Sequence, residues 1–228
     1  MAALPVCGTI APDWRCAVEF EPVATAADEL AGKPGVVRFL RLPPRRCVMI
    51  DGDGPAGEAA FAPRMPGLYA TAWTLRFALK RRGAVTKVRP LEGLWWTADG
   101  TTDLDVIFAD GRLDPRDTWR WILFIGLPDE ATDDECAAAL SAGRTKLQPP
   151  YAANLRVELF DEGDVAQLLH LGPYADERPS VERLHAAIAD AGLCPRGRHH
   201  EIYMGDPRRG DPAKMKTILR QPVAPAGA

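Results

Sequence analysis

From Val36 onward, apolar residues occur in short runs bounded by Pro and Gly, the pattern expected of strands separated by turns. Residues 47–50 predict the first strand, and the Asp-Gly-Asp-Gly-Pro run at 51–55 predicts the turn that ends it. Residues 87–96 and 119–127 have the same apolar character and predict two more strands. The first half of the chain is therefore expected to be rich in strands.

Between Gly67 and Gly83 the spacing changes and predicts a helix. Two apolar stripes recur there at helical intervals, the first formed by Leu68, Ala72, Leu75 and Leu79 and the second by Tyr69, Trp73 and Phe77. Gly83 can adopt the left-handed conformation that ends a helix. A second helix, at residues 133–143, is predicted from the capping-box pair Thr132 and Glu135, and it links the two halves of the chain.

The second half of the chain repeats the order of the first. A strand is predicted at residues 165–171, a helix at 180–191, and two strands at 199–204 and 215–219. Strand, helix, strand and strand therefore occur twice, which is typical of an internal duplication. The fold class that this order indicates is α+β.

The two halves also correspond in position. Gly83 and Gly192 each end a helix, and Glu92 and Glu201 each follow nine residues later. This spacing predicts that the two acids are equivalent, with a pseudo-twofold axis between the halves. A ligand would then bind on that axis, because binding sites favour the seam between packed units.

We expect a single domain at residues 36–228, made of two pseudo-symmetric halves at about 36–130 and 150–223. Residues 1–35 are rich in Ala, Pro and Gly and carry no clear periodicity, so they are expected to form an N-terminal extension.

Composition and charge exclude several classes of protein. The 228 residues are 46% hydrophobic and 26% charged, which is the balance of a folded globular chain. The net charge is −3 and there is no long basic run, which argues against direct binding to nucleic acid. No apolar run approaches the roughly 18 residues of a membrane span, and the N-terminus lacks a signal peptide's positive charge, so a cytoplasmic protein is expected. The five cysteines are scattered and argue against a disulfide framework.

Glu201 is the strongest candidate for a functional residue. Alternation along its strand places His199, Glu201 and Tyr203 on one face. A carboxylate flanked by aromatic groups on a half-buried strand is costly to desolvate, so it finds a partner, rises in pKa or is held for a ligand. The alternative is an exposed glutamate that is paired with an arginine.

A second candidate segment surrounds Glu92. Alternation groups Glu92 with Leu94 and Trp96 and places Gly93 and Trp95 opposite, so each face of this strand displays an indole. Gly93 removes a side chain between the rings, as it would to admit a ligand. The alternative is that both indoles fill the core, the interpretation favoured for the other strand tryptophans.

Other kinds of site have weak support. His199 and His200 are strand neighbours that point apart, and no ligand-spaced partner completes a metal site. Dinucleotide-loop, Walker and nucleophile-elbow patterns are missing from the sequence. We therefore expect neither a metal nor a cofactor.

Four segments resemble the GyrI-like family of small-molecule-binding proteins. They are Pro90–Trp96 (PLEGLWW), Gln167–Tyr174 (QLLHLGPY), His199–Arg209 (HHEIYMGDPRR) and Lys216–Val223 (KTILRQPV). The resemblance covers roughly residues 40–223. It implies two strand-helix-strand-strand modules that form a curved antiparallel sheet, with two long helices behind it and a central pocket for bulky aromatic, often cationic compounds. No DNA-binding helix-turn-helix precedes the repeats, so the chain is similar to the stand-alone members.

The resemblance also implies roles for particular residues. In hydrolytic members a pocket glutamate activates water to open the strained cyclopropane of DNA-alkylating natural products, and this role would pass to Glu201, with Tyr203 beside it. The ligand-contacting positions would be Trp95, Trp96, Glu92, Tyr69, Trp73, Tyr174, His199 and His170. Trp73 stands where many relatives have a tyrosine, so a hydrogen bond from that helix is in question.

Two functions stay open from the sequence. One is a detoxifying hydrolase with Glu201 as general base. The other is a non-catalytic protein that sequesters lipophilic cations, in which carboxylates and aromatic faces attract the positive charge. Either would take a hydrophobic aromatic or cationic small molecule as its partner and act as a monomer or weak homodimer, without nucleic acid or membrane.

Overall fold

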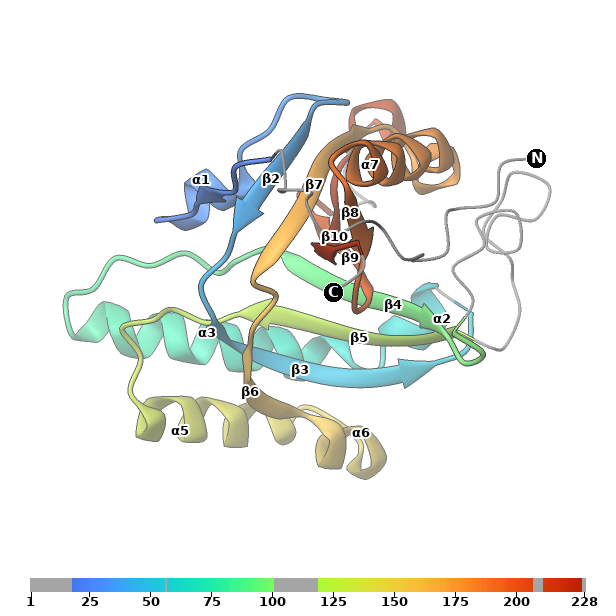
Figure 1. Ribbon diagram of the computed structural model, residues 1–228. Helices are drawn as coiled ribbons and strands as arrows, with labels where there is room; N and C mark the ends of the chain where they lie inside the picture. Colours follow the sequence, from blue (N-terminus) through green and yellow to red (C-terminus); the bar gives the residue numbers. More distant parts are fainter. Residues whose placement is uncertain (1–17, 56, 101–118, 207–210, 227–228) are drawn as a thin grey trace. The chain divides into compact units, whose positions relative to one another are not determined.

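The computed structural model describes residues 18–55, 57–100, 119–206 and 211–226. By its internal contacts the chain divides into two compact units. Unit 1 comprises Met1–Pro43, Asp99–Asp114 and Glu162–Ala228, and unit 2 comprises Pro44–Ala98 and Pro115–Asp161. Each unit contains one predicted strand-helix-strand-strand series (Figure 1).

Unit 2 has four strands and four helices among its described residues. In chain order they are β3 (Arg45–Asp53), α2 (Glu58–Phe61), α3 (Met65–Arg81), β4 (Leu91–Thr97), β5 (Trp119–Gly126), α5 (Asp133–Arg144), α6 (Pro149–Asn154) and β6 (Arg156–Phe160). The strands pair antiparallel in the order β4-β5-β3-β6. Helix α3 packs against α5, β3 and β5, so the helices lie along one side of these strands.

Helix α3 confirms one of its two predicted stripes as core. Leu68, Leu75 and Leu79 are fully buried, and Ala72 nearly so. The second stripe is different, because Trp73 and Phe77 are 43% and 48% exposed. The two rings contact each other at 5.7 Å between centroids, and the Arg76 guanidinium lies over both of them.

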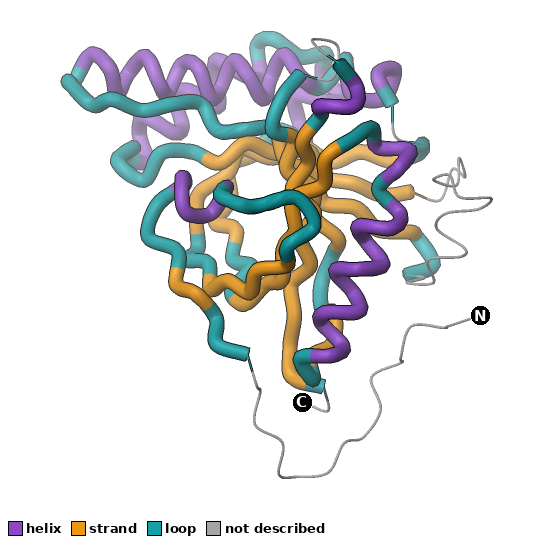
Figure 2. Tube along the Cα trace, turned by 90° about the horizontal axis from the view of Figure 1, so that it is seen from above, coloured by secondary structure: helices purple, strands orange, loops and turns teal. Residues whose placement is uncertain are grey.

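Unit 1 contains the remaining elements. They are β1 (Glu21–Pro22), α1 (Ala26–Leu30), β2 (Val37–Arg41), β7 (Asp164–Leu171), the 3₁₀ turn η2 (Tyr174–Asp176), α7 (Arg178–Asp190), β8 (Leu193–Pro195), β9 (His199–Tyr203), the 3₁₀ turn η3 (Pro212–Lys214) and β10 (Lys216–Pro225). The strand order is β1-β2-β7-β10-β9, and β8 also pairs with β10. Helix α7 lies along one side of these strands and contacts β7, β8 and β10 (Figure 2).

The predicted repeat is reproduced in the strand order. In unit 2 the central strand β5 lies between β4 and β3, and in unit 1 β10 lies between β9 and β7 in the same way. Gly83 and Gly192 both have positive φ angles, 88° and 71°, directly after the long helices. The α+β class and the mostly antiparallel pairing are therefore confirmed, and among the described strands β1 pairs with β2 in parallel.

The segment before residue 36 is more ordered than an extension. The described part of it contributes β1 and α1, and α1 begins with a capping box between Thr25 and Asp28. Strand β2 pairs antiparallel with β7, which brings the N-terminal residues into unit 1. The part of this segment before residue 18 lies outside the described residues.

The turn predicted at residues 51–55 is wrong in its first part. Strand β3 continues through Asp51 and Asp53, and the chain turns only at Gly54, whose φ is 82°. Gly52 lies inside the strand, and the Trp121 ring packs against its backbone, where an added Cβ would come within 2.0 Å of the indole. Gly52 therefore provides room for a core side chain rather than a turn.

Helix α5 confirms the predicted capping box. The Thr132 hydroxyl accepts from the Glu135 backbone N–H at 3.2 Å, and the Glu135 carboxylate accepts from the Thr132 N–H at 3.0 Å. This helix packs within unit 2 against α3 and α6.

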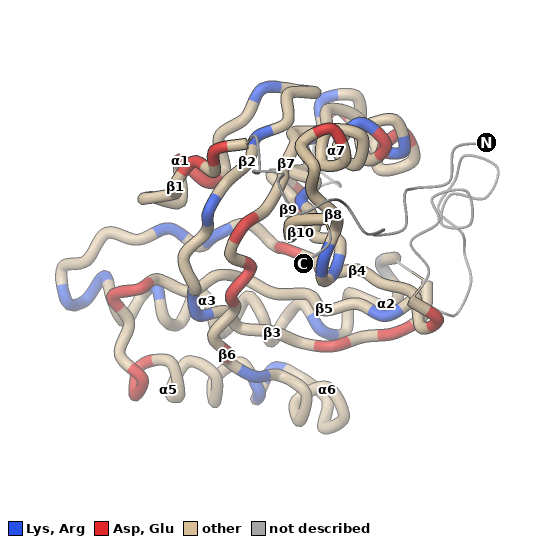
Figure 3. The backbone as a smooth tube through the Cα atoms, viewed as in Figure 1, with Lys and Arg blue, Asp and Glu red and all other residues tan. Residues whose placement is uncertain are grey.

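Acidic and basic residues are interspersed along both units (Figure 3). Within the described ranges, no helix is both long and apolar enough to cross a membrane.

Candidate functional site

Strand β9 places three polar side chains on one face, as predicted. Its burial alternates, with His199, Glu201 and Tyr203 partly exposed and His200 and Ile202 buried. The His199 Nε2 lies 3.8 Å from Glu201 Oε1.

This face of β9 is the one that α7 covers. Glu201 is directly opposite Leu219 on β10, and Tyr203 is opposite Thr217. Leu219 packs in the core with Leu184 of α7. Because directly paired residues of neighbouring strands point to the same side of a sheet, the Glu201 side chain projects toward the helix side of unit 1.

The Glu201 carboxyl group is largely withdrawn from water, with 18% of its side-chain surface exposed. Burial raises its pKa from 4.5 to about 7, while the hydrogen bond from Tyr203 and the nearby His200 oppose the shift. None of the described lysines and arginines forms an ion pair with it. Glu201 therefore changes between carboxylic acid and carboxylate near neutral pH, which suits a general base.

Two tyrosines flank this carboxyl group. The rings of Tyr174 and Tyr203 meet edge to face, with centroids 5.8 Å apart. Burial and the nearby acids Glu201 and Glu177 raise the pKa of Tyr174 to about 12, so its phenol stays protonated. Because 39% of Tyr174 is exposed, an aromatic surface lies accessible beside Glu201.

A second acid belongs to this site. Glu177 lies directly before α7 and is only 5% exposed, and its Oε1 has no hydrogen-bond partner. Burial and the charge of Glu201 raise the pKa of Glu177 to about 9, although Thr217 nearby opposes the shift. Glu177 is therefore a neutral carboxylic acid at pH 7.

The sequence did not single out Glu177. An acid at the start of a helix usually lies in solvent and complements the helix dipole, so its position carried no functional signal. The related feature of the sequence is that Glu177 follows three residues after Tyr174, the last residue of the segment QLLHLGPY that resembles the GyrI-like family.

The histidines of this region are held neutral. Burial and the neighbouring His185 and His200 lower the pKa of His199 to about 3, and burial lowers the pKa of His185 as well. The Nδ1 atoms of His185 and His199 are buried without hydrogen-bond partners, as is the Thr217 hydroxyl. Unpartnered buried polar atoms are rare in folded proteins and call for a water or ligand partner.

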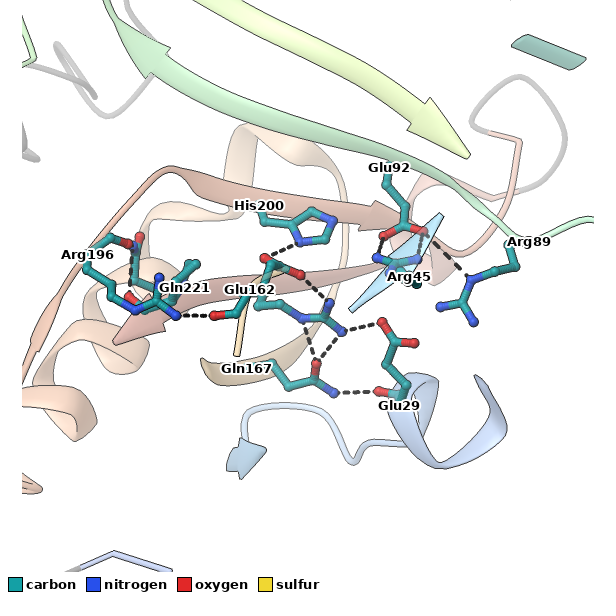
Figure 4. A network of polar contacts seen from close by, with 11 residues as sticks. Glu29, Arg45, Arg89, Glu92, Glu162, Gln167, Arg196, His200 and Gln221 are labelled. Atoms are coloured by element: carbon teal, nitrogen blue, oxygen red, sulfur yellow. Dashed lines mark hydrogen bonds and ion pairs between the residues drawn. The ribbon is translucent and has the colours of Figure 1, made fainter. Parts of the chain in front are cut away.

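Glu92 has a different environment. Its side chain is fully buried, and both oxygens accept from Arg45, at 2.7 and 2.5 Å (Figure 4). Arg89 Nε approaches the same carboxylate at 3.9 Å. A bidentate ion pair of this kind satisfies the carboxylate within the protein.

The predicted equivalence of Glu92 and Glu201 is wrong. Glu92 is directly opposite Phe124 on β5, and Phe124 lies in a cluster to which no helix contributes. Glu201 instead faces α7. A shift of one residue along a strand moves a side chain to the other face, so equal spacing from a glycine did not establish equivalence. By face and pairing, Gly93 of β4 corresponds to Glu201.

The two indoles of β4 point to opposite sides, as alternation predicts. Trp95 is 7% exposed and contacts Phe61, Trp119 and Trp121. Trp96 packs with the cluster around Phe124 on the other face. Both rings therefore contribute to the core of unit 2, and their contact with a ligand stays a prediction.

The remaining predicted positions are distributed over both units. His170 lies on β7 of unit 1, where Nδ1 is 2.9 Å from the Ser180 hydroxyl and Nε2 is 3.3 Å from the Pro173 carbonyl. Both ring nitrogens are therefore occupied by the protein. Tyr69 and Trp73 lie on α3 of unit 2.

Across the described ranges, no group of three or more His, Cys, Asp and Glu side chains is arranged to hold a metal ion. Cys47, Cys136 and Cys194 are free thiols, and Cys7 and Cys16 lie outside the described residues.

Several solved structures are similar to this chain. A conserved protein of uncharacterised function from Listeria innocua is 30% identical, with a TM-score of 0.70 over 87% of this chain and 97% of that chain. A hydrolase encoded by lin2189 from the same organism is 28% identical, with a TM-score of 0.68 over 87% of this chain and 96% of that chain. The EcmrR C-terminal domain, at 11% identity and a TM-score of 0.50, covers 83% of this chain and 98% of its own and shares the fold alone.

No family model and no curated protein matches the sequence. The Listeria protein at 30% identity is matched over nearly its whole length, and the duplicated strand-helix-strand-strand order accompanies that match. The chain belongs to the GyrI-like family of small-molecule-binding proteins.

Proposed function

We propose that the chain is a hydrolase that binds flat aromatic compounds and opens strained electrophilic rings, with Glu201 as the general base. The observation that carries this proposal is the Glu201 carboxyl group, which is only 18% exposed, lies beside two tyrosines and has a pKa of about 7. Catalytic bases work best when their pKa lies close to the working pH. The hydrolases from Listeria innocua, at 28% identity, favour a hydrolytic reaction.

The reaction is an addition of water to a cyclopropane conjugated with a carbonyl group. Ionised Glu201 takes a proton from water while the water oxygen bonds to a ring carbon. The strained carbon–carbon bond breaks, its electron pair enters the conjugated system, and the carbonyl oxygen takes up a proton. The Tyr203 phenol donates to the Glu201 carboxylate and so favours its basic form.

Tyr174 and Tyr203 would hold the planar part of the substrate. Their edge-to-face arrangement leaves a partly exposed ring of Tyr174 next to the base. Burying an aromatic surface on such a ring is favourable in itself, and it orients the strained ring relative to the water.

The test uses a spirocyclopropyl cyclohexadienone, whose ring opening to a phenol is followed by absorbance and mass spectrometry. Glu201→Gln removes the base at constant size and should lower kcat by about 10²- to 10⁴-fold while the compound still binds. Glu182→Gln is the matched control, because Glu182 is an exposed helix acid paired with Arg178. Equal turnover by wild type and Glu201→Gln would refute the proposal.

The same site could sequester lipophilic cations without catalysis, since an ionised Glu201 beside aromatic rings attracts positive charge. Titration with a fluorescent dye cation separates the two functions. Saturable binding that Glu201→Gln abolishes, together with no ring-opened product from wild type, would identify a binder instead of an enzyme.

A further inference from the structure

Two rows of polar side chains face each other on the α7 side of unit 1. One row is on β9, where His199, Glu201 and Tyr203 follow at every second residue. The other begins at Glu177 and includes His185 of α7. Each row is roughly 12–13 Å long, because a strand rises about 3.3 Å per residue and a helix about 1.5 Å.

The two rows run in opposite directions. His199, at the start of β9, is close enough to His185 for the His185 ring to lower the pKa of His199. Glu177, at the other end, is close to Glu201 and to Thr217, which is paired with Tyr203. Glu201 therefore lies between the histidine end and the Glu177 end.

The Glu177 end is the inner part of the site. Glu177 is 5% and Thr217 is 1% exposed, and Glu177 Oε1 and Thr217 Oγ1 have no hydrogen-bond partner at normal distance. The Thr217 hydroxyl is nevertheless near enough to Glu177 to lower its pKa against the effect of burial. Leaving a buried donor or acceptor unsatisfied costs about 1–3 kcal/mol. A site that keeps two such groups next to a functional carboxylate is suited to a polar atom of a ligand.

We propose that Glu177 is the general acid of the same reaction, and that it protonates the carbonyl oxygen of the substrate as the strained ring opens. This inference rests on the proposed function of Glu201. Glu177 gives its proton to the oxygen that receives the electron pair, while Glu201 accepts the proton of the attacking water. A proton then passes from Glu201 to Glu177, so the net reaction adds one water molecule.

The two carboxyl groups have the properties that this division of roles requires. By exposed surface Glu177 is the more buried of the pair, at 5% against 18% for the Glu201 side chain. Glu177 keeps its proton to a pKa of about 9, whereas Glu201 loses its proton at a pKa of about 7. Pairs of acids whose environments separate their pKa values are typical of acid–base catalysis. Between these two values one carboxyl group is ionised and the other is protonated.

Few other charges act on this pair. The titratable groups on this face are Glu201, Tyr203 and His199 of β9, His170 of β7, Tyr174 of η2, His185 of α7 and Asp206 after β9. His200, on the opposite face of β9, also acts on Glu201 and lowers its pKa. Both His185 and His199 are neutral at pH 7, and Tyr174 stays protonated. The rate should therefore depend on pH through the two glutamates.

The decisive variant is Glu177→Gln, which keeps the size of the side chain and an N–H donor but has no proton to transfer. With the spirocyclopropyl cyclohexadienone, wild type should give a bell-shaped pH profile of kcat/KM, with limbs near pH 7 and 9. Glu177→Gln should lose the alkaline limb and reduce kcat by about 10²-fold or more, with KM changed less. Glu177→Asp should restore the alkaline limb in part, and Glu182→Gln should keep the full profile.

The outcomes separate the two proposals. Turnover by wild type that Glu201→Gln abolishes but Glu177→Gln leaves unchanged in rate and pH profile would overturn the role of Glu177 alone. Equal turnover by wild type and Glu201→Gln would overturn both. The carboxyl ¹³C signals of wild type give a test without any variant, because a Glu177 signal that titrates near pH 4.5 would also exclude a neutral acid at this position.

Discussion

Strands β4 and β9 hold the same place in the two repeats, yet they use their faces differently. On the side away from the helices each strand carries a buried polar side chain with a partner inside its own unit. Glu92 is ion-paired with Arg45 in unit 2, and His200 is hydrogen-bonded to Glu162 in unit 1. On the helix side, β4 presents Gly93 and Trp95, whereas β9 presents Glu201 and Tyr203.

The difference shows that two units with the same strand order can satisfy their buried polar groups and still present different side chains on the helix side. In unit 1, Arg220 is fully buried and binds both Glu162 and Glu29, with Gln167 accepting from the same guanidinium (Figure 4). The charges of Arg220, Glu162 and Glu29 are thus satisfied by one another. The helix-side acids Glu201 and Glu177 are not paired with a described lysine or arginine.

The largest effect should come from removing each acid in turn and measuring turnover. Glu201→Gln should reduce kcat by about 10²- to 10⁴-fold, because the base is lost. Glu92→Gln should leave the turnover of the folded fraction within about twofold, because Glu92 is already neutralised by Arg45. Steady-state kinetics on both variants measure this contrast. A larger loss in Glu92→Gln would mean that the buried ion pair also serves the reaction.

The same two variants should rank in the reverse order in stability. Glu92→Gln leaves the Arg45 guanidinium, 12% exposed, without its carboxylate and should cost about 3–5 kcal/mol of unfolding free energy. Glu201→Gln replaces an acid that is costly to bury and should be neutral or stabilising. Urea denaturation measures both. The double variant Arg45→Met with Glu92→Leu should recover much of the loss, and a persistent deficit would indicate that packing rather than charge is responsible.

Features set by neighbours along the chain could be predicted from the sequence. The capping box of α5 joins Thr132 to Glu135 within one helical turn, and the buried stripe of α3 follows from helical spacing alone. The shared face of His199, Glu201 and Tyr203 follows in the same way from alternation.

Features set by distant contacts could not be predicted. Glu29 binds Arg220 across most of the sequence, so an apparently aperiodic N-terminal segment is anchored in unit 1. The glycine at position 52 suggests a turn in the sequence. Its actual reason is the Trp121 ring of β5, which packs against the Gly52 backbone. The role proposed for Glu177 depends on its burial and on its closeness to Glu201 of β9 and Thr217 of β10, which no local pattern encodes.

The unpaired acids of unit 1 should also make stability depend on pH. Because their pKa values are raised, folded Glu177 and Glu201 keep protons that the unfolded chain releases. The free energy of unfolding therefore falls as pH rises, up to about pH 7 for Glu201 and about pH 9 for Glu177. Below pH 6.5 the neutral His185 and His199 act in the opposite direction, so the clearest window is above that value. Wild type should lose on the order of 2 kcal/mol between about pH 6.5 and 9, measured by urea denaturation. Glu177→Gln should show a flatter curve, and an equally steep one would assign the loss to other groups.

The smallest effect concerns the hydrogen bond that tunes Glu201. The Tyr203 phenol lowers the pKa of the Glu201 carboxyl group, so Tyr203→Phe should raise it further and leave less base at neutral pH. We expect about a tenfold loss of kcat/KM at pH 6 and a smaller loss at pH 8, because a hydrogen bond to a charged group contributes about 1.5–3 kcal/mol at most. Tyr174→Phe is the matched control, since it removes a phenol from the same ring pair and should leave the acid limb in place. A loss of equal size at both pH values would mean that Tyr203 positions the substrate and does not tune the pKa of Glu201. The difference between β9 and β4 would then be one of side-chain shape more than of the proton affinity of a carboxyl group.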